Sequence, residues 1–192
     1  MPTLLFVCQA NIARSASAEL LARHAIGGEG AWEVASAGVD ALAGHGVDPE
    51  LARALHRRGI GTSAHIARQV DADMLADADL VLAFEARQRT WMLKESPASV
   101  RSTFTIRRAA HALRRLPRRA EPLSFLALDD APYLGEDDFA DPYGRGSAAA
   151  ESAVAEIAEL LEVILAAVGA TPRVTASPLR GMSQGVSPGA LL

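Results

Sequence analysis

The chain alternates short apolar runs with longer stretches of helical periodicity, and this alternation limits the folds open to it. The candidate strands cover residues 3–7, 33–36, 79–84 and 103–106. The helical stretches cover residues 15–26, 48–58, 86–95, 107–116 and 148–168, the last with Ser147 as its expected cap and Gly169 as its expected end. Strands that are joined through helices favour a parallel sheet covered on both faces, which is an α/β fold.

Length and composition predict one domain and disfavour some classes of binding partner. With 192 residues, we expect a domain over residues 1–169 and a flexible tail over 170–192, a region rich in Pro, Gly and Ser. The net charge of -4 disfavours a nucleic-acid partner. The only cysteine, Cys8, excludes an internal disulfide framework and a cysteine metal cluster. No secretory signal and no apolar span of about 20 residues are found, so we expect a cytoplasmic protein without a membrane partner.

Residues 8–15, Cys-Gln-Ala-Asn-Ile-Ala-Arg-Ser, lie between the first strand and the first helix. Ligands of parallel α/β folds bind at the carboxyl ends of the strands, so this loop is the first candidate for a site. Its backbone N–H groups and the helix dipole suit a tetrahedral oxyanion. The same environment would favour the thiolate of Cys8, which makes it a candidate in-line nucleophile. By itself the spacing from Cys8 to Arg14 is common, and its placement between strand and helix is what favours a function.

Other residues supply what a cysteine nucleophile needs. The planar fork of Arg14 can hold two phosphate oxygens, and the hydroxyl of Ser15 can donate to the sulfur. Asn11 suits a left-handed backbone position in a tight loop. Asp141, in Asp-Pro-Tyr, is a candidate proton donor for a leaving oxygen, and Tyr143 can form an apolar wall beside an aromatic group.

Together these pieces resemble the low-molecular-weight protein tyrosine phosphatase family. The matching stretches, in family order, are residues 6–19, 36–38, 59–60, 63–69, 78–82 and 141–143. The resemblance covers roughly residues 3–168. It implies a three-layer fold with a central four-stranded parallel sheet, helices on both faces and a phosphate-binding loop after strand 1.

The resemblance also implies a reaction and its residues. Cys8 would attack phosphorus while Asp141 protonates the tyrosyl oxygen, and Asp141 would then activate water to release phosphate from a cysteinyl-phosphate. Arg14 would bind phosphate throughout, with no metal or cofactor. The substrate would be a phosphotyrosine protein or a small aryl phosphate. The implied substrate-binding residues are Gln9, Ala10, Asn11, Ile12, Ala13, Ser15, Leu42 and Tyr143. The implied loop-supporting residues are Asn11, Ser15, Ser36 and His65.

The chain departs from the family pattern at several positions. Ala10 replaces a glycine, which would carry a penalty if that position needs positive φ. Ala13 replaces a frequent second cysteine, Gln9 replaces an apolar residue, and Leu42 stands where some members have an aromatic wall. Ile12 is the apolar choice of tyrosine-directed members, whereas arginine-directed members favour threonine. The family's acidic residue after the third strand is matched by Glu85.

Two alternatives to a phosphatase remain open from the sequence. One is an oxyanion-binding or phosphopeptide-binding regulatory module with little catalysis, suggested by Ala10 and Gln9. The other is an arsenate reductase-like protein that uses an external thiol, because the chain has no further cysteine for a thiol relay.

Two further motifs are assigned no function. Residues 59–64 match a dinucleotide-binding spacing but follow a helix instead of a strand, so that hypothesis fails. The stretch 101–119 contains seven arginines, and we interpret it as a solvated helix face in preference to a basic docking face.

Overall fold

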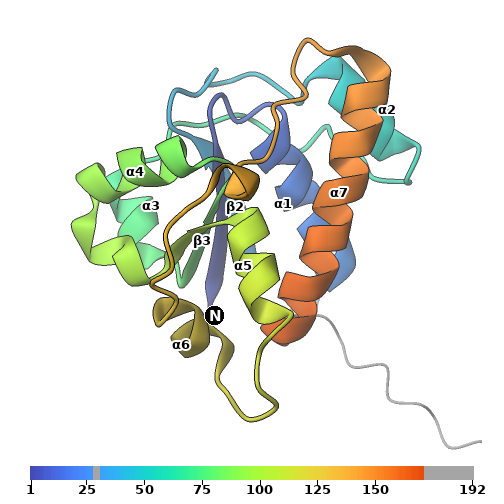
Figure 1. The fold of residues 1–192 in the computed structure, drawn as a ribbon. Helices are drawn as coiled ribbons and strands as arrows, with labels where there is room; N and C mark the ends of the chain where they lie inside the picture. The colour runs from blue at the N-terminus through green and yellow to red at the C-terminus, as the bar shows by residue number, and fades with distance from the viewer. Residues whose placement is uncertain (28–30, 171–192) are drawn as a thin grey trace, which may run out of the picture.

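The computed structural model describes residues 1–27 and 31–170, and its centre is a four-stranded parallel sheet (Figure 1). The strands are β1 (Thr3–Cys8), β2 (Glu33–Gly38), β3 (Leu80–Ala83) and β4 (Thr103–Thr105), in the spatial order β2-β1-β3-β4. Every pair of neighbours is parallel, so all four carboxyl ends lie at one edge. The predicted sheet, its four strands and its parallel direction are confirmed.

Seven α-helices and two 3-10 helices accompany the sheet in the described residues. They are α1 (Arg14–Ile26), α2 (Pro49–His56), α3 (Ala72–Asp77), α4 (Ala86–Glu95), η1 (Pro97–Arg101), α5 (Ile106–Leu113), α6 (Pro122–Ala127), η2 (Gly135–Asp137) and α7 (Gly146–Ala167). Within those residues, no helix is long and apolar enough to cross a membrane.

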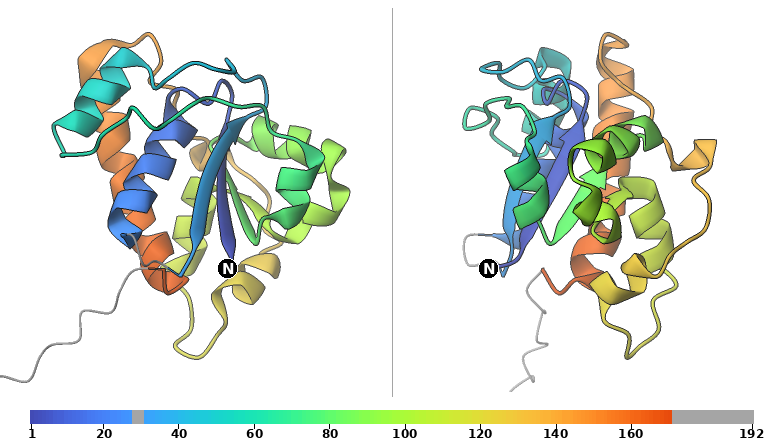
Figure 2. Two further views of the ribbon diagram at one scale, coloured as in Figure 1. Left: turned by 180° about the vertical axis from the view of Figure 1, so that it is seen from behind. Right: turned by 90° about the vertical axis from the view of Figure 1, so that its left-hand side faces the viewer.

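Helices cover both faces of the sheet, which makes three layers (Figure 2). Leu4 and Phe6 of β1 point into the larger core, which α1, α2, α5, α6 and α7 close. Leu5 and Val7 point into the smaller core, which α3 and α4 close. A strand buried on both faces needs apolar residues at every position, and this is why β1 and β3 are continuous apolar runs.

Several helix boundaries differ from the sequence prediction. Ser147 is not the cap of the last helix: it lies inside α7, whose first turn follows Arg145. The helix expected over 107–116 ends at Leu113. The six-residue helices α3 and α6 were not predicted, because they are too short to show a periodic pattern. Their starts are held by the side chains of Asp71 and Glu121, which accept backbone N–H groups.

The expected tail begins at Ala170, and its remaining residues, 171–192, lie outside the described residues. Ala170 itself is buried in the larger core, and its N–H donates to the carbonyl of Leu165.

Gly38, at the end of β2, lies against the backbone of the loop that follows β1. A Cβ on Gly38 would meet the carbonyl oxygen of Gln9 at 2.6 Å and the backbone nitrogen of Asn11 at 3.0 Å. Both are backbone atoms, so a side chain here would displace the loop itself. The Ser-Ala-Gly stretch therefore ends in glycine because the loop needs the space.

We expect Gly38→Ala to lower the free energy of unfolding by about 1–3 kcal/mol, the usual cost of overpacking. Chemical denaturation would measure it. Gly61→Ala is the matched control, because nothing lies within 4 Å of a Cβ at Gly61. Equal stability of the two variants would contradict the close approach at Gly38.

Candidate active site

The loop after β1 turns its carbonyl groups outward. Each carbonyl from residue 8 to residue 12 accepts a hydrogen bond from outside the loop. The donors, in order, are the N–H groups of Val39 (2.9 Å), Asp40 (2.9 Å) and Leu42 (3.0 Å), the ring Nε2 of His65 (2.8 Å) and the N–H of Asp48 (2.8 Å). Within the described residues, the N–H groups of residues 9–13 donate to no protein acceptor. Successive free N–H groups at the start of a helix form a cradle for an anion.

Asn11 holds the turn in this loop. It is the only non-glycine residue of the described chain with positive φ, at 56°. Its side-chain Nδ2 donates to Ser15 Oγ at 2.9 Å and to Ser36 Oγ at 2.8 Å, while its Oδ1 accepts the N–H of Arg68 at 2.9 Å. The left-handed position therefore falls on Asn11 and not on Ala10, so the methyl group of Ala10 meets no such penalty.

The sulfur of Cys8 lies at the end of β1, beneath this loop. Cys8 is 2% exposed, and its Sγ is 2.9 Å from Ser15 Oγ. Ser15 Oγ accepts from Asn11, and its own proton has two acceptors within reach, the sulfur at 2.9 Å and the carbonyl oxygen of Ala37 at 3.3 Å. The arrangement gives the buried sulfur a polar partner at the end of β1.

A buried carboxylate, Glu19, completes the support of the loop and was missed in the sequence. Its Oε2 accepts the hydroxyl of Ser36 at 2.5 Å and lies 3.3 Å from Nδ1 of His65. Burial raises the pKa of Glu19, but hydrogen bonds from His65 and Ser36 and the charge of Arg23 outweigh it and hold the pKa below its ordinary value. No local pattern identifies this role, because Ser36 and His65 lie 17 and 46 residues away from Glu19 in the sequence.

Arg14 is the largest fully buried side chain, at 1% exposure. Its Nη1 donates to Glu85 Oε1 at 2.6 Å and to the carbonyl of Phe139 at 3.0 Å, and its Nη2 donates to Asp141 Oδ2 at 2.7 Å. The guanidinium therefore joins the loop to two segments that are distant in the sequence. A cation this deeply buried requires such partners.

Glu85 bridges Arg14 to the surface. Its carboxylate also accepts Nε of Arg87 at 2.5 Å and Nε2 of Gln88 at 2.8 Å. Burial raises the pKa of Glu85, yet the hydrogen bonds from Arg87 and Arg14 dominate and hold it below its ordinary value. The carboxylate is therefore ionised near neutral pH and balances the charge of Arg14.

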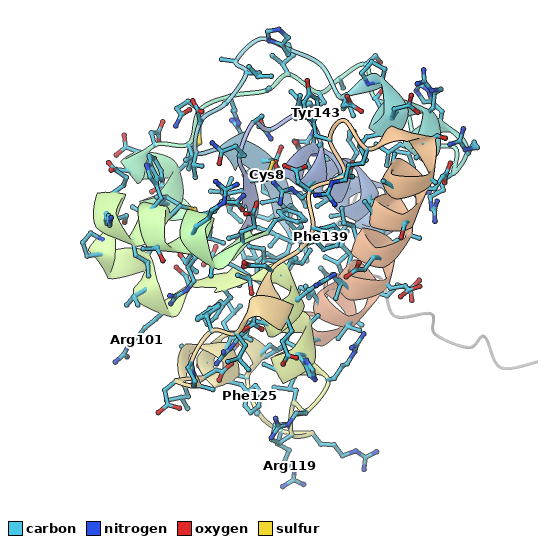
Figure 3. All side chains as sticks on the ribbon, turned by 45° about the horizontal axis from the view of Figure 1, so that its top comes forward. Cys8, Arg101, Arg119, Phe125, Phe139 and Tyr143 are labelled. Atoms are coloured by element: carbon cyan, nitrogen blue, oxygen red, sulfur yellow. The ribbon has the colours of Figure 1, made fainter. Side chains whose placement is uncertain are left out.

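The predicted acid and wall residues lie on the exposed side of the loop. The side chain of Asp141 is 41% exposed, and its Oδ1 accepts the N–H of Tyr143 at 3.2 Å. Figure 3 shows Tyr143 at the same end of the molecule as Cys8. Tyr143 and Leu42 are both more than two-fifths exposed, so apolar side chains flank the loop without closing over it.

The arginine-rich stretch 101–119 does not form one solvated face, and this corrects the sequence interpretation. Figure 3 shows Arg101 at the lower left of the molecule and Arg119 apart from it, at the bottom. Arg107 pairs with Glu156, and Arg108 is 7% exposed and bound to Asp129. The stretch is therefore divided between internal contacts and surface.

Two further structural features concern other ligand sites, namely a cavity away from the loop and the placement of side chains that could bind a metal ion. A cavity of about 590 Å³ lies between α5, α6 and residues 128–137, away from the predicted site residues. Within the part of the chain that the structure describes, no group of three or more His, Cys, Asp or Glu side chains is placed to hold a metal ion.

Comparison with known proteins identifies the class to which this fold and loop belong. The sequence profile of the low molecular weight phosphotyrosine protein phosphatase family matches residues 3–173. The chain belongs to this family, as the resemblance predicted.

The similar proteins are named for different activities. The chain is 35% identical over 104 residues to a probable low molecular weight protein-tyrosine-phosphatase, EpsP, of Ralstonia nicotianae, covering 54% of this chain and 70% of that one. It is 39% identical over 80 residues to an arsenate reductase of Bacillus licheniformis, covering 42% of this chain and 54% of that one. The YwlE arginine phosphatase from Geobacillus stearothermophilus shares the fold, with a TM-score of 0.70, 23% identity, and coverage of 88% of this chain and 94% of that one.

We expect Glu19→Gln to lower the free energy of unfolding by about 1–3 kcal/mol at pH 7, because two buried donors lose their ionised acceptor. Since the folded pKa of Glu19 lies below its ordinary value of 4.5, the ionised form stabilises the fold above that value. This contribution is lost as the pH falls through the folded pKa. Denaturation at a series of pH values should show the two proteins converging in acid.

The exposed Glu50→Gln variant is the control for this experiment. Glu50 pairs with Arg53 on the surface of α2, and its loss should change stability by no more than about 0.5 kcal/mol. A difference between wild type and Glu19→Gln that does not depend on pH would contradict the role given to the ionised carboxylate.

Proposed function

We propose that this family member hydrolyses phosphotyrosine, or similar aryl phosphomonoesters, through a cysteinyl-phosphate formed on Cys8. The observation that carries the proposal is the cradle of free N–H groups at residues 9–13, with the sulfur of Cys8 beneath it. A tetrahedral dianion held there would present its phosphorus to the sulfur for in-line attack. Loop residues Gln9, Ala10, Asn11, Ile12, Ala13 and Ser15 would bind the phosphate through their backbone.

In the first step the Cys8 thiolate forms a bond to phosphorus, and the bond from phosphorus to the aryl oxygen breaks. Asp141 transfers its proton to that oxygen, so the product leaves as a neutral phenol. Arg14 carries the positive charge that offsets the three equatorial phosphate oxygens. The 2.7 Å contact between Arg14 and Asp141 supports the location of the acid, because it places this carboxyl group beside the guanidinium that would hold the phosphate.

In the second step water attacks the cysteinyl-phosphate. Asp141, now ionised, takes a proton from the water, and the bond from sulfur to phosphorus breaks to release phosphate and the thiolate. The Ser15 hydroxyl, 2.9 Å from the sulfur, stabilises the departing thiolate by donating a hydrogen bond. Asn11, Ser36 and His65 hold the loop in both steps. The proposal requires no metal or cofactor.

For the substrate we favour phosphotyrosine over phosphoarginine. Ile12 follows the pattern of the tyrosine-directed members, and the EpsP relative is named a probable protein-tyrosine-phosphatase. Tyr143 and Leu42, exposed beside the loop, can contact the ring of the leaving group. We place the reaction in the cytoplasm, where a thiol nucleophile stays reduced.

Arsenate reduction is a second candidate, because a relative with this name is 39% identical over 80 residues. Cys8 is the single cysteine, so an arsenate adduct on its sulfur would require an external thiol for reduction. Turnover of arsenate with glutathione, faster than turnover of aryl phosphate, would favour this candidate. Tight phosphate binding without turnover would favour a regulatory module.

We expect purified, reduced protein to hydrolyse p-nitrophenyl phosphate near pH 6. The assay measures the p-nitrophenol that is released. Cys8→Ser should lose turnover and still bind phosphate, because the N–H cradle does not depend on the sulfur. Arg14→Lys should bind phosphate more weakly, because an ammonium cannot reproduce the planar fork. Wild-type protein without turnover would overturn the proposed function.

Peroxide should inactivate the protein without the protection that a neighbouring cysteine gives. With alanine at position 13, a sulfenic acid on Cys8 has no vicinal thiol and proceeds to the irreversible sulfinic acid. We expect little recovery with dithiothreitol after excess peroxide. The Ala13→Cys variant, which restores the family's second cysteine, should recover more. Full recovery of wild-type activity would contradict this expectation.

A further inference from the structure

The proposed general acid Asp141 stands at the end of a long segment with little regular structure. This acid segment, residues 129–141, runs from α6 to the loop edge of the sheet, and its only helical turn is η2 (Figure 1). Phe139 is its most deeply buried apolar side chain, at 2% exposure. A segment that belongs to no strand or α-helix needs specific side-chain interactions to hold a catalytic group within a fraction of an ångström.

Arg107, at the start of α5, supplies such an interaction. Its Nη1 donates to the carbonyl of Asp138 at 2.7 Å and to that of Glu136 at 3.3 Å. Its guanidinium also lies 5.1 Å from the centre of the Phe139 ring. On the other side, its Nε donates at 2.8 Å to Glu156 of α7, which fixes the side chain between helix and segment.

The contacts continue from Phe139 to the site. The Phe139 N–H donates to the carbonyl of Phe84 at 2.7 Å, and the two rings meet edge to face at 5.5 Å. The Phe139 carbonyl accepts a hydrogen bond from Nη1 of Arg14. Two residues later, the carboxylate of Asp141 accepts a hydrogen bond from Nη2 of the same guanidinium. Arg107 therefore holds the stretch that sets where the carboxyl of Asp141 lies.

Arg108 acts elsewhere on the same segment. It forms two hydrogen bonds to Asp129, donates to the carbonyls of Ala131 and Pro132, and lies over Tyr133. These contacts fasten the start of the acid segment, far along the chain from Asp141. Arg108 also lies 3.7 Å from the carboxylate of Asp137, but of the two arginines only Arg107 contacts Asp138 and Phe139, which are closer to the acid.

We propose that Arg107 is a positioning residue for proton transfer by Asp141. The inference rests on the proposed function. Its loss would let residues 136–139 move and would misplace the acid, while the nucleophile and the phosphate cradle stay as they are. The reaction should slow for substrates whose leaving oxygen needs a proton. It should change little for substrates whose phenolate is a stable leaving group without one.

The test compares kcat/KM for phenyl phosphate and for 2,4-dinitrophenyl phosphate, because kcat/KM reports the step in which the aryl group leaves. We expect Arg107→Gln to lower kcat/KM about tenfold for phenyl phosphate and less than about twofold for the dinitrophenyl ester. The tenfold loss is smaller than the roughly 100-fold or more that a general acid contributes, because the acid is misplaced and not removed. In an Asp141→Asn background, Arg107→Gln should cost less than about twofold on phenyl phosphate, because both changes remove the same proton transfer.

Arg57→Gln is the matched control. Arg57 also joins two helices through a surface carboxylate, Glu151 of α7, but contacts no part of the acid segment. Arg57→Gln should leave the ratio of kcat/KM for the two esters unchanged. Arg107→Lys keeps the charge and one donor toward the carbonyls, so it should give an intermediate ratio, and it replaces Arg107→Gln if that variant fails to fold.

The outcomes separate this inference from the proposed function. Equal losses on both esters, or a full tenfold loss in the Asp141→Asn background, would show that Arg107 supports only the fold and would overturn the inference. No turnover of either ester by wild-type protein would overturn the proposed function and the inference together.

Discussion

The shape of the phosphate loop depends on the hydrogen bonds that occupy its carbonyl groups. All five carbonyls from residue 8 to residue 12 are bound from outside, and Gly38 allows the supporting strand to approach without a side chain. With the carbonyls held outward, the N–H groups are left to face an anion. The cradle is therefore made by backbone atoms, and side-chain changes such as Ala10 and Ala13 leave it in place.

A second constraint is the burial of Arg14. Removing a guanidinium from water is unfavourable unless its donors are satisfied by charged and polar acceptors. Glu85 comes from the end of β3, while Phe139 and Asp141 come from the acid segment, and all three contact this one side chain. Arg14 thus assembles the site from three separate parts of the chain.

The arginines of α5 show how a segment outside the sheet and the α-helices is held in place. Arg107 and Arg108 bind backbone carbonyls, carboxylates and aromatic rings of residues 129–139. These bonds hold a segment that has no strand or α-helix of its own. Charge-assisted hydrogen bonds are directional, so they position a chain as well as hold it.

The sequence by itself determined the parallel sheet, because strands buried on both faces must be apolar at every position, and it determined the loop from Cys8 to Ser15, because its chemistry is local. It left Glu19 unassigned and made the stretch 101–119 look like a solvated face, because a charged residue carries no sign of its distant partner. Which acids neutralise Arg14, and what holds Asp141 beside it, only the tertiary structure decided. The contacts of Arg14 with Glu85 and Asp141 join residues more than 70 positions apart, and the free energy that selects them comes from burial in the folded chain.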